Sequence, residues 1–176
     1  MLNLLSTRRS IRQYQPRSVE KEKVDQIVKA ALLAPSGRGI YPQKFIVVDD
    51  KELLEKFGAA REQGSAFLSG APLAIVVLAD STATNVWIED ACISAAIIQL
   101  TAHSLGLGTC WVQIRERQQS AEKTSEEYLR ELLGFPEEYR VECIIGIGYP
   151  DEEKPAKTDE DLDFERVRYN NYQKTY

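Results

Sequence analysis

The most restrictive feature of this sequence is the run at residues 73–78, in which six consecutive side chains are apolar. Side chains alternate between the two faces of a β-strand, so a strand without polar positions is buried on both faces. We therefore expect residues 73–78 to form a central strand of a sheet that is covered on both sides. With 176 residues, of which 43% are hydrophobic, the chain is long enough to bury this core within one domain.

Helical and strand patterns flank this central run. The uncharged stretch at residues 91–114 has the length of a membrane span, but polar residues, Gly106 and Gly108 interrupt it, which favours a buried helix followed by a strand. The expected helices are residues 2–5, 19–33, 51–57, 85–105 and 125–133, with Ser18, Asn85 and Ser125 as N-caps. The expected further strands are residues 45–48, 109–114 and 141–149.

The segment at residues 6–12, Ser-Thr-Arg-Arg-Ser-Ile-Arg, holds three guanidinium groups and three hydroxyl groups. Guanidinium groups match the geometry of phosphate oxygens, and hydroxyl groups complete such a cradle. The segment predicts an anion site, although a solvated basic turn explains the same residues when they are considered alone.

The charge distribution favours a small phosphate-bearing ligand at this segment. Residues 1–19 contain four arginines and no acid, whereas the whole chain has a formal net charge of −5 and a pI of about 5.1. A nucleic-acid-binding protein usually spreads basic residues over a face and has a high pI. Because the positive charge is local here, we expect neither nucleic acid nor a membrane as the partner.

The remaining polar residues do not form a set typical of protein-based catalysis, and no metal site is expected. The one histidine, His103, lies in an apolar helical pattern without a Gly-rich nucleophile turn nearby, so we interpret it as a core residue. Glu89 and Asp90 are helix neighbours that point apart, so capping or solvation explains them better than acid–base catalysis. The cysteines lack disulfide or metal-ligand spacing and are interpreted as small buried hydrophobic residues: Cys92, Cys110 and Cys143.

A cofactor is compatible with this pattern. Residues 34–39, Ala-Pro-Ser-Gly-Arg-Gly, form either a loop where backbone can approach a ligand or a plain connector between a helix and a strand. A phosphate cradle, glycine-rich loops and apolar walls without a protein nucleophile are typical of an enzyme whose reactive group belongs to a cofactor.

Four short motifs, in order from residue 8 to residue 150, resemble those of the nitroreductase family of flavoproteins. Residues 8–12 resemble its R-R-S-x-R motif, and residues 34–38 resemble its A-P-S loop. Residues 105–111, Leu-Gly-Leu-Gly-Thr-Cys-Trp, resemble its L-G-L-G-T-x-W segment, and residues 146–150 resemble its closing G-x-G-Y-P. Each motif alone is short, but the ordered set is specific.

The resemblance implies an α+β fold, a three-layer sandwich in which helices flank a central mixed, mainly antiparallel sheet. It also implies an intertwined homodimer with FMN at the subunit interface, where the chemistry takes place at the flavin N5 and Arg12 supports it from the pyrimidine edge. Residues 35–37 would come from the other subunit, and a basic residue of the tail would add a phosphate contact. The implied cofactor-binding residues are Arg8, Arg9, Ser10, Arg12, Pro35, Ser36, Gly37, Trp111, Val112, Gln113 and Arg166, with Arg168 and Lys157 as alternatives in the tail.

The implied activity is that of an FMN-dependent NAD(P)H oxidoreductase with a ping-pong cycle. NADH or NADPH would reduce the flavin, and a nitro compound, quinone or enone would then be reduced in the same place. The alternatives from other classes are a non-redox FMN-binding or storage module and a cofactor-free, anion-responsive interaction protein. The chain departs from the family pattern Q-P-W-x-F at Gln43, which replaces the tryptophan.

The end of the chain has a different composition. Residues 151–165 contain eight acids and two lysines and can bury little, and a short aromatic, basic end follows. We therefore expect a single domain, residues 1–176, in which residues 151–176 form a C-terminal extension that packs on the partner subunit. The start of the chain lacks the pattern of a signal peptide, which predicts a cytoplasmic protein.

Overall fold

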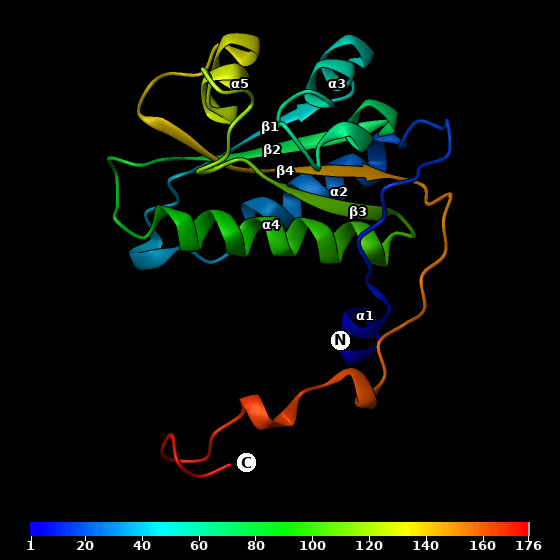
Figure 1. The fold of residues 1–176 in the computed structure, drawn as a ribbon, viewed down its shortest axis with the longest axis vertical. Coiled ribbons are helices and arrows are strands. Elements are labelled where there is room, and N and C mark those ends of the chain that lie inside the picture. The colour runs from blue at the N-terminus through cyan, green and yellow to red at the C-terminus, as the bar shows by residue number, and fades with distance from the viewer. Residues whose placement is uncertain (176) are drawn as a thin grey trace.

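The computed structural model describes residues 1–175 and has three layers (Figure 1). The middle layer is a four-stranded sheet in the order β1-β2-β4-β3, with antiparallel neighbours throughout. Helices α3 and α5 cover one face, and α2 and α4 cover the other, so the expected α+β sandwich is confirmed. The strands are β1 (Gln43–Val48), β2 (Leu73–Asp80), β3 (Gly108–Gln113) and β4 (Tyr139–Gly148). The helices that cover the sheet are α2 (Lys21–Leu32), α3 (Lys51–Phe57), α4 (Trp87–Ser104) and α5 (Ser125–Leu133).

The central strand β2 separates two cores. Val76 lies in the core that α3 and α5 cover, whereas its neighbours Ile75 and Val77 lie in the core that α2 and α4 cover. All three side chains are at most 1% exposed. Burial on both faces thus accounts for the uninterrupted apolar run, as expected.

The helix starts differ from the expected ones. Ser18 and Asn85 lie outside the helices, because α2 and α4 begin later, after the N-cap residues Glu20 and Val86, whose side chains form no capping hydrogen bond. α5 is capped by Thr124 rather than Ser125. The Thr124 hydroxyl accepts the Glu127 N–H at 3.1 Å, and the Glu127 carboxylate accepts the Thr124 N–H at 2.8 Å. This capping box satisfies two helix-end donors at once, whereas Ser125 is buried one position later.

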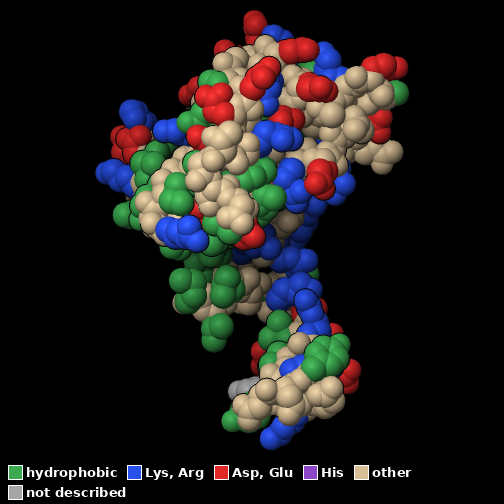
Figure 2. Space-filling view, turned by 90° about the vertical axis from the view of Figure 1, so that its left-hand side faces the viewer, with side chains coloured by type: hydrophobic (Ala, Val, Ile, Leu, Met, Phe, Trp, Pro, Cys, Tyr) green, Lys and Arg blue, Asp and Glu red, His purple; other side chains and the backbone are tan. Residues whose placement is uncertain are grey.

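Helix α1 (Leu2–Thr7) and the end of the chain project from the sandwich on the same side (Figure 1). Every residue from 155 to 175 is exposed, and this segment is the C-terminal arm. Hydrophobic side chains lie on the projecting end (Figure 2). The large exposed ones on the arm are Leu162, Phe164, Val167, Tyr169 and Tyr172. The arm therefore has no core within its own chain.

The stretch at residues 91–114 forms most of α4 and then β3, as expected. Within residues 1–175, no helix combines the length and the apolar character that crossing a bilayer requires. Cys110 and Cys143 are buried, but the expectation of a buried side chain is wrong for Cys92. Cys92 is half-buried because it lies on the flank of α4 that faces Glu142 and Arg115 rather than the core.

Candidate functional site

The arginine-rich segment lies along the outer edge of β3. Ser10 and Thr109 form an isolated parallel bridge, in which the Ile11 N–H donates to the Thr109 carbonyl at 2.9 Å. On the other side of the segment, the Asp151 N–H donates to the Gln13 carbonyl at 2.9 Å. Within residues 1–175 this bridge is the one parallel pairing. The four strands of the sheet, which was expected to be mixed and mainly antiparallel, pair only in antiparallel fashion.

Gly108 allows the segment to approach β3 closely. A Cβ atom at this position would lie 2.7 Å from the Cβ of Ile11, which is closer than side chains tolerate. This glycine of the L-G-L-G-T-x-W segment is therefore explained by its contact with Ile11, which keeps the arginines against the strand.

Four polar side chains gather around Cys110 on β3 and form the cationic cluster: Arg8, Ser10, Arg12 and Lys154. Burial raises the pKa of the Cys110 thiol, and the three positive charges together with a hydrogen bond from Ser10 act against that rise. Residues 8, 10 and 12 alternate along an extended segment, so their side chains share one side. Three positively charged side chains and a hydroxyl group beside the buried residue Cys110 are suited to binding an anionic group such as phosphate.

Arg9 points to the opposite side of the segment. Its guanidinium donates to the Pro155 carbonyl, and its side chain lines a cavity of about 310 Å³ together with Thr7 and His103. His103 is half-buried rather than a core residue, and a 2.9 Å hydrogen bond joins its Nε2 to Thr7 Oγ1. Burial, and then the charge of Arg8, lower the pKa of His103, so the imidazole is neutral at pH 7. Arg9 thus lies on the other side of the segment from Arg8 and Arg12, in a cavity that Lys154 also lines, and His103 anchors α1.

Lys154 is the tail residue that reaches the cluster, and the sequence motifs did not single it out. Its Nζ donates to the Ser10 carbonyl at 2.6 Å. Arg166, which was expected there, lies on the C-terminal arm that projects from the sandwich (Figure 1). Lys157 lies closer, since its backbone N–H donates to the Ser6 carbonyl at 2.8 Å. The available signal was the short distance in sequence between Lys154 and the G-x-G-Y-P motif, where the chain still runs beside the arginines.

Beyond the bridge, the outer edge of β3 is open to a ligand. Among the described residues, β3 has a neighbouring strand, β4, on one side only. Because the Thr109 carbonyl points outward to Ile11, the backbone groups of Trp111 and Gln113 point to the same open side. Polar groups without partners at such an edge favour a ligand that supplies them.

Asp90, near the start of α4, holds the loop at residues 34–39. Asp90 is 2% exposed, and its carboxylate accepts the Ser36 hydroxyl at 2.8 Å and the Gly37 N–H at 2.9 Å. The Ser36 hydroxyl in turn accepts the Tyr41 N–H at 2.9 Å. The expectation that Asp90 caps a helix or is solvated is therefore wrong, because its carboxylate serves a loop that is distant in sequence.

Within one chain, the two groups of expected site residues lie at opposite ends of α4. Asp90 holds Ser36 near the first turn, whereas His103 in the last turn contacts Thr7, which precedes the cationic cluster. The helical rise from position 90 to position 103 corresponds to about 20 Å. One chain therefore does not bring the loop at residues 35–37 to Arg8.

A buried carboxylate, Glu142, orients the side chains at the end of β3. The pairing of β2 with β4 skips Glu142, which is the extra residue of a β-bulge. Glu142 is 2% exposed and accepts from Gln113 Nε2 at 2.9 Å and from Arg115 Nε at 2.8 Å. Gln113 Oε1 then accepts the Trp111 indole N–H at 2.9 Å. A residue outside the motifs thus fixes two of the expected site residues.

Gln43, which replaces the family tryptophan, is buried on β1. Its side-chain oxygen has no hydrogen-bond partner in the described chain. Together with Leu32, Tyr41 and Phe45 it lines a cavity of about 290 Å³. This position therefore presents an unpaired amide oxygen among apolar side chains.

Comparison with known proteins gives the same family as the motifs. Residues 5–65 and 59–149 match the model of the nitroreductase family. A protein of Archaeoglobus fulgidus, named as an NADH dehydrogenase/NAD(P)H nitroreductase, is 39% identical over 157 residues, which cover 87% of each protein.

Solved structures of two nitroreductases are similar over nearly the whole chain. An FMN-dependent nitroreductase from Clostridium difficile R20291 is 54% identical with a TM-score of 0.97, and the match covers 98% of this chain and 100% of that one. A nitroreductase with bound FMN from Desulfitobacterium hafniense DCB-2 is 27% identical with a TM-score of 0.75, and the match covers 97% of each chain.

Proposed function

The chain belongs to the nitroreductase family, and we propose that it is an FMN-dependent oxidoreductase that takes a hydride from NADH or NADPH and passes it to a small electrophilic acceptor. The acceptor classes are nitro compounds, quinones and enones. The observation that carries the proposal is the cationic cluster at the open edge of β3.

The residues at this edge fit a phosphorylated flavin. The cations and the Ser10 hydroxyl of the cluster supply charge-assisted hydrogen bonds for a phosphate. The outward-facing backbone of Trp111 and Gln113 supplies partners for the polar edge of a ring system. The hydrogen-bond partners for the phosphate and those for the ring thus lie one after the other along the outer edge of β3.

Within the cluster, each residue has a separate task. We assign the phosphate and the ribityl chain to Arg8, Ser10 and Lys154. Arg12 is assigned to the pyrimidine edge of the flavin, and Glu152 fixes its position by accepting the Arg12 N–H. A guanidinium at that edge stabilises the negative charge that accumulates there on reduction.

Bound FMN supplies hydride acceptance and donation at its N5 atom. The chain itself has to hold the ring and leave one face open to both substrates. We assign residues 111–113 to the ring, along which their backbone runs. The hydrogen bonds from Glu142 through Gln113 to Trp111 keep these side chains in fixed positions beside it.

We further propose a homodimer with a site at each subunit interface. Pro35, Ser36 and Gly37 lie about 20 Å from the cluster along α4 in one chain, so they serve the site of the partner subunit. The C-terminal arm, with its exposed aromatic side chains, extends the single domain across the partner and carries Arg166 toward the partner's site. We place the protein in the cytoplasm, with small molecules rather than nucleic acid or a membrane as its partners.

The visible spectrum of the purified protein, before and after anaerobic addition of NADH or NADPH, tests the proposed function. We expect a yellow protein whose flavin absorption is bleached by at least one of the two donors. Bound flavin that neither donor bleaches would indicate a storage module. A colourless protein that does not bind added FMN would overturn the proposal.

A further inference from the structure

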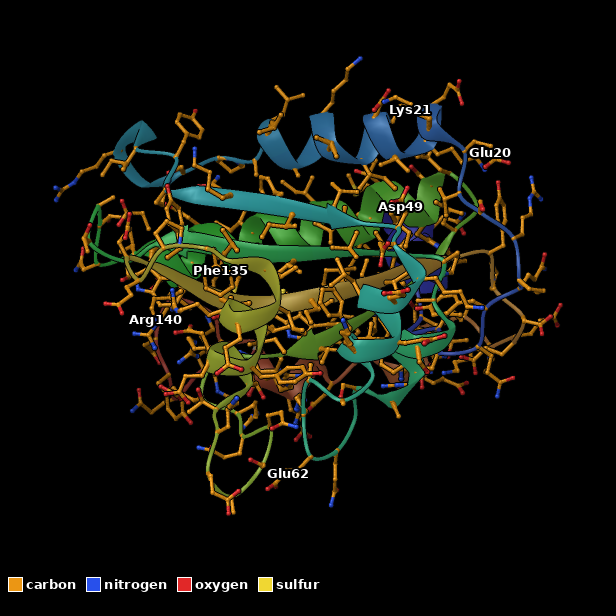
Figure 3. All side chains as sticks on the ribbon, turned by 90° about the horizontal axis from the view of Figure 1, so that it is seen from above. Glu20, Lys21, Asp49, Glu62, Phe135 and Arg140 are labelled. Atoms are coloured by element: carbon orange, nitrogen blue, oxygen red, sulfur yellow. The ribbon has the colours of Figure 1, made fainter. Side chains whose placement is uncertain are left out.

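Two arginines on separate loops line another cavity beyond the end of β3. Arg61 follows α3 and Arg117 follows β3, and a 3.1 Å hydrogen bond from the Glu62 N–H to the Gln118 carbonyl joins the two loops. The cavity between them has a volume of about 310 Å³. Figure 3 shows Glu62 on a loop that projects beyond the sandwich.

Both loops are held in place by the fold. Ser65 is fully buried, and its hydroxyl accepts the Arg61 N–H at 3.1 Å and donates to the Gly58 carbonyl at 2.9 Å. On the other loop, the Arg117 N–H donates to the Ile114 carbonyl at 3.1 Å, directly after β3. The backbone positions of the two arginines therefore do not depend on contacts of their own side chains.

The two arginine side chains line the same cavity, and neither is paired with a carboxylate in the described part of the chain. Burial, and then the positive charge of Arg117, lower the pKa of Arg61. Within residues 1–175, neither arginine forms a salt bridge, although Glu62 lies at the same cavity. The other acid of the cavity, Glu116, is paired with Arg115 at 2.9 Å. Two guanidinium groups at one cavity that form no salt bridge keep hydrogen-bond donors available for an anion.

We propose that Arg61 and Arg117 bind the phosphate groups of the nicotinamide dinucleotide. The inference rests on the proposed function, because the cavity begins at the turn after Gln113, beside the place assigned to the flavin ring. If the nicotinamide of a dinucleotide lies over the flavin ring, its phosphates extend beyond the edge of that ring. The two loops lie on that side. Guanidinium forks bind phosphate oxygens in pairs, which makes two arginines a suitable site for a pyrophosphate.

Anaerobic reduction of the FMN-loaded protein tests this site in the variants Arg61→Ala and Arg117→Ala. Three hydride donors are compared: NADH, NADPH and 1-benzyl-1,4-dihydronicotinamide, which has no phosphate. Each variant should raise the half-saturating concentration of NADH and NADPH about tenfold, the effect of one hydrogen bond to a charged group. Reduction by the phosphate-free donor should stay unchanged, and Arg61→Lys should restore part of the loss.

A matched control is Arg140→Ala, which removes one arginine at a different edge of the molecule (Figure 3). Arg140 is paired with Glu126, which keeps its contact with Arg130 when Arg140 is absent. The control should reduce normally with all three donors. Calorimetric titration with ADP-ribose, which carries the two phosphates but no nicotinamide, should show about tenfold weaker binding to each loop variant than to the control.

Two results would overturn the inference: unchanged reduction by NADH and NADPH, or equal slowing with the phosphate-free donor. If no donor reduces the wild-type protein, the proposed function fails by itself. The ADP-ribose titration then still decides the inference, because equal affinity in the variants and the control would exclude a phosphate site at these loops.

Discussion

The Ser36 hydroxyl donates to the Asp90 carboxylate at 2.8 Å, and this bond ties the loop at residues 34–39 to the start of α4. Asp90 also accepts the Gly37 N–H, and it is 2% exposed. The loop that the homodimer proposal assigns to the partner's site is therefore fixed by a buried side chain of its own chain, and its shape does not depend on the partner.

Removing this carboxylate should destabilise the protein. In Asp90→Ala the Gly37 N–H and the Ser36 hydroxyl lose their acceptor, which costs about 1–3 kcal/mol for a buried group. Asp90→Asn keeps the shape and one acceptor oxygen, so we expect it to lower the free energy of unfolding by less. Urea unfolding measures both changes, with the exposed neighbour Glu89→Ala as the control. Equal stability of wild type and Asp90→Ala would contradict a supporting role for Asp90.

Arg8 and Arg9 should differ in their effect on FMN binding, although they are neighbours in one motif. Arg8→Ala removes a cation of the cationic cluster and should weaken binding by about 1.5–3 kcal/mol, the range for a hydrogen bond to a charged group. Arg9→Ala removes a contact to the Pro155 carbonyl on the other side and should weaken binding less. Titration of the apoprotein with FMN, followed by flavin fluorescence, gives both affinities. Equal losses would refute the separation of the two arginines.

Much of the fold follows from local sequence patterns, because local patterns determine which segments are buried. The apolar run at residues 73–78 requires cover on both faces, and β2 has it. Position 108 requires a glycine because a Cβ atom there would collide with Ile11. The motif R-R-S-x-R indicates an anion site, but only the extended conformation of the chain separates Arg9 from Arg8 and Arg12.

Local sequence patterns do not identify the residues that hold the candidate site in place. Asp90 contacts Ser36, which is 54 positions away in the sequence, and a local pattern cannot predict a contact over that separation. Glu142 reaches Gln113 because a β-bulge turns it out of the alternation of its strand. Lys154 reaches the cluster because the chain after β4 continues alongside residues 9–15, whereas the family resemblance pointed to the arginines further along the tail.

Replacing Glu142 should disturb Trp111 through Gln113. In Glu142→Gln one of the two acceptor oxygens becomes a donor that faces Gln113 or Arg115, so we expect a loss of about 1–3 kcal/mol in the free energy of unfolding. The emission of Trp111, measured after Trp87→Phe has removed the other tryptophan, should also shift. The exposed Glu137→Gln is the control. Lower stability with unchanged Trp111 emission would contradict the connection through Gln113.

Acid should remove the stabilisation that Glu20 provides. The Tyr149 hydroxyl donates to the Glu20 carboxylate at 2.6 Å, and this bond, the Glu20 backbone and Arg17 lower the pKa of Glu20 from 4.5 to about 2. Since the pKa is lower in the folded state, the contribution is present above about pH 4.5 and is lost as the pH falls toward 2. Urea unfolding should therefore show a stability difference between wild type and Glu20→Gln at neutral pH that shrinks in acid. A difference that is independent of pH would contradict this assignment, and Tyr149→Phe should reproduce the shrinking difference.

Ending the chain after Thr158 tests the proposed homodimer, because it removes most of the C-terminal arm and keeps the contact between the Lys157 N–H and Ser6. Of the removed residues, 159–175 are exposed and pack on no core of their own chain, so circular dichroism should show an intact sandwich. Light scattering at micromolar concentration should show a dimer for wild type and a larger share of monomer for the shortened chain. Buried apolar area contributes about 25 cal/mol per Å² to association, and the arm supplies such area in Phe164 and Tyr172. A wild-type monomer would refute the dimer, and a shortened chain that dimerises as tightly as wild type would show that the arm does not pack on the partner.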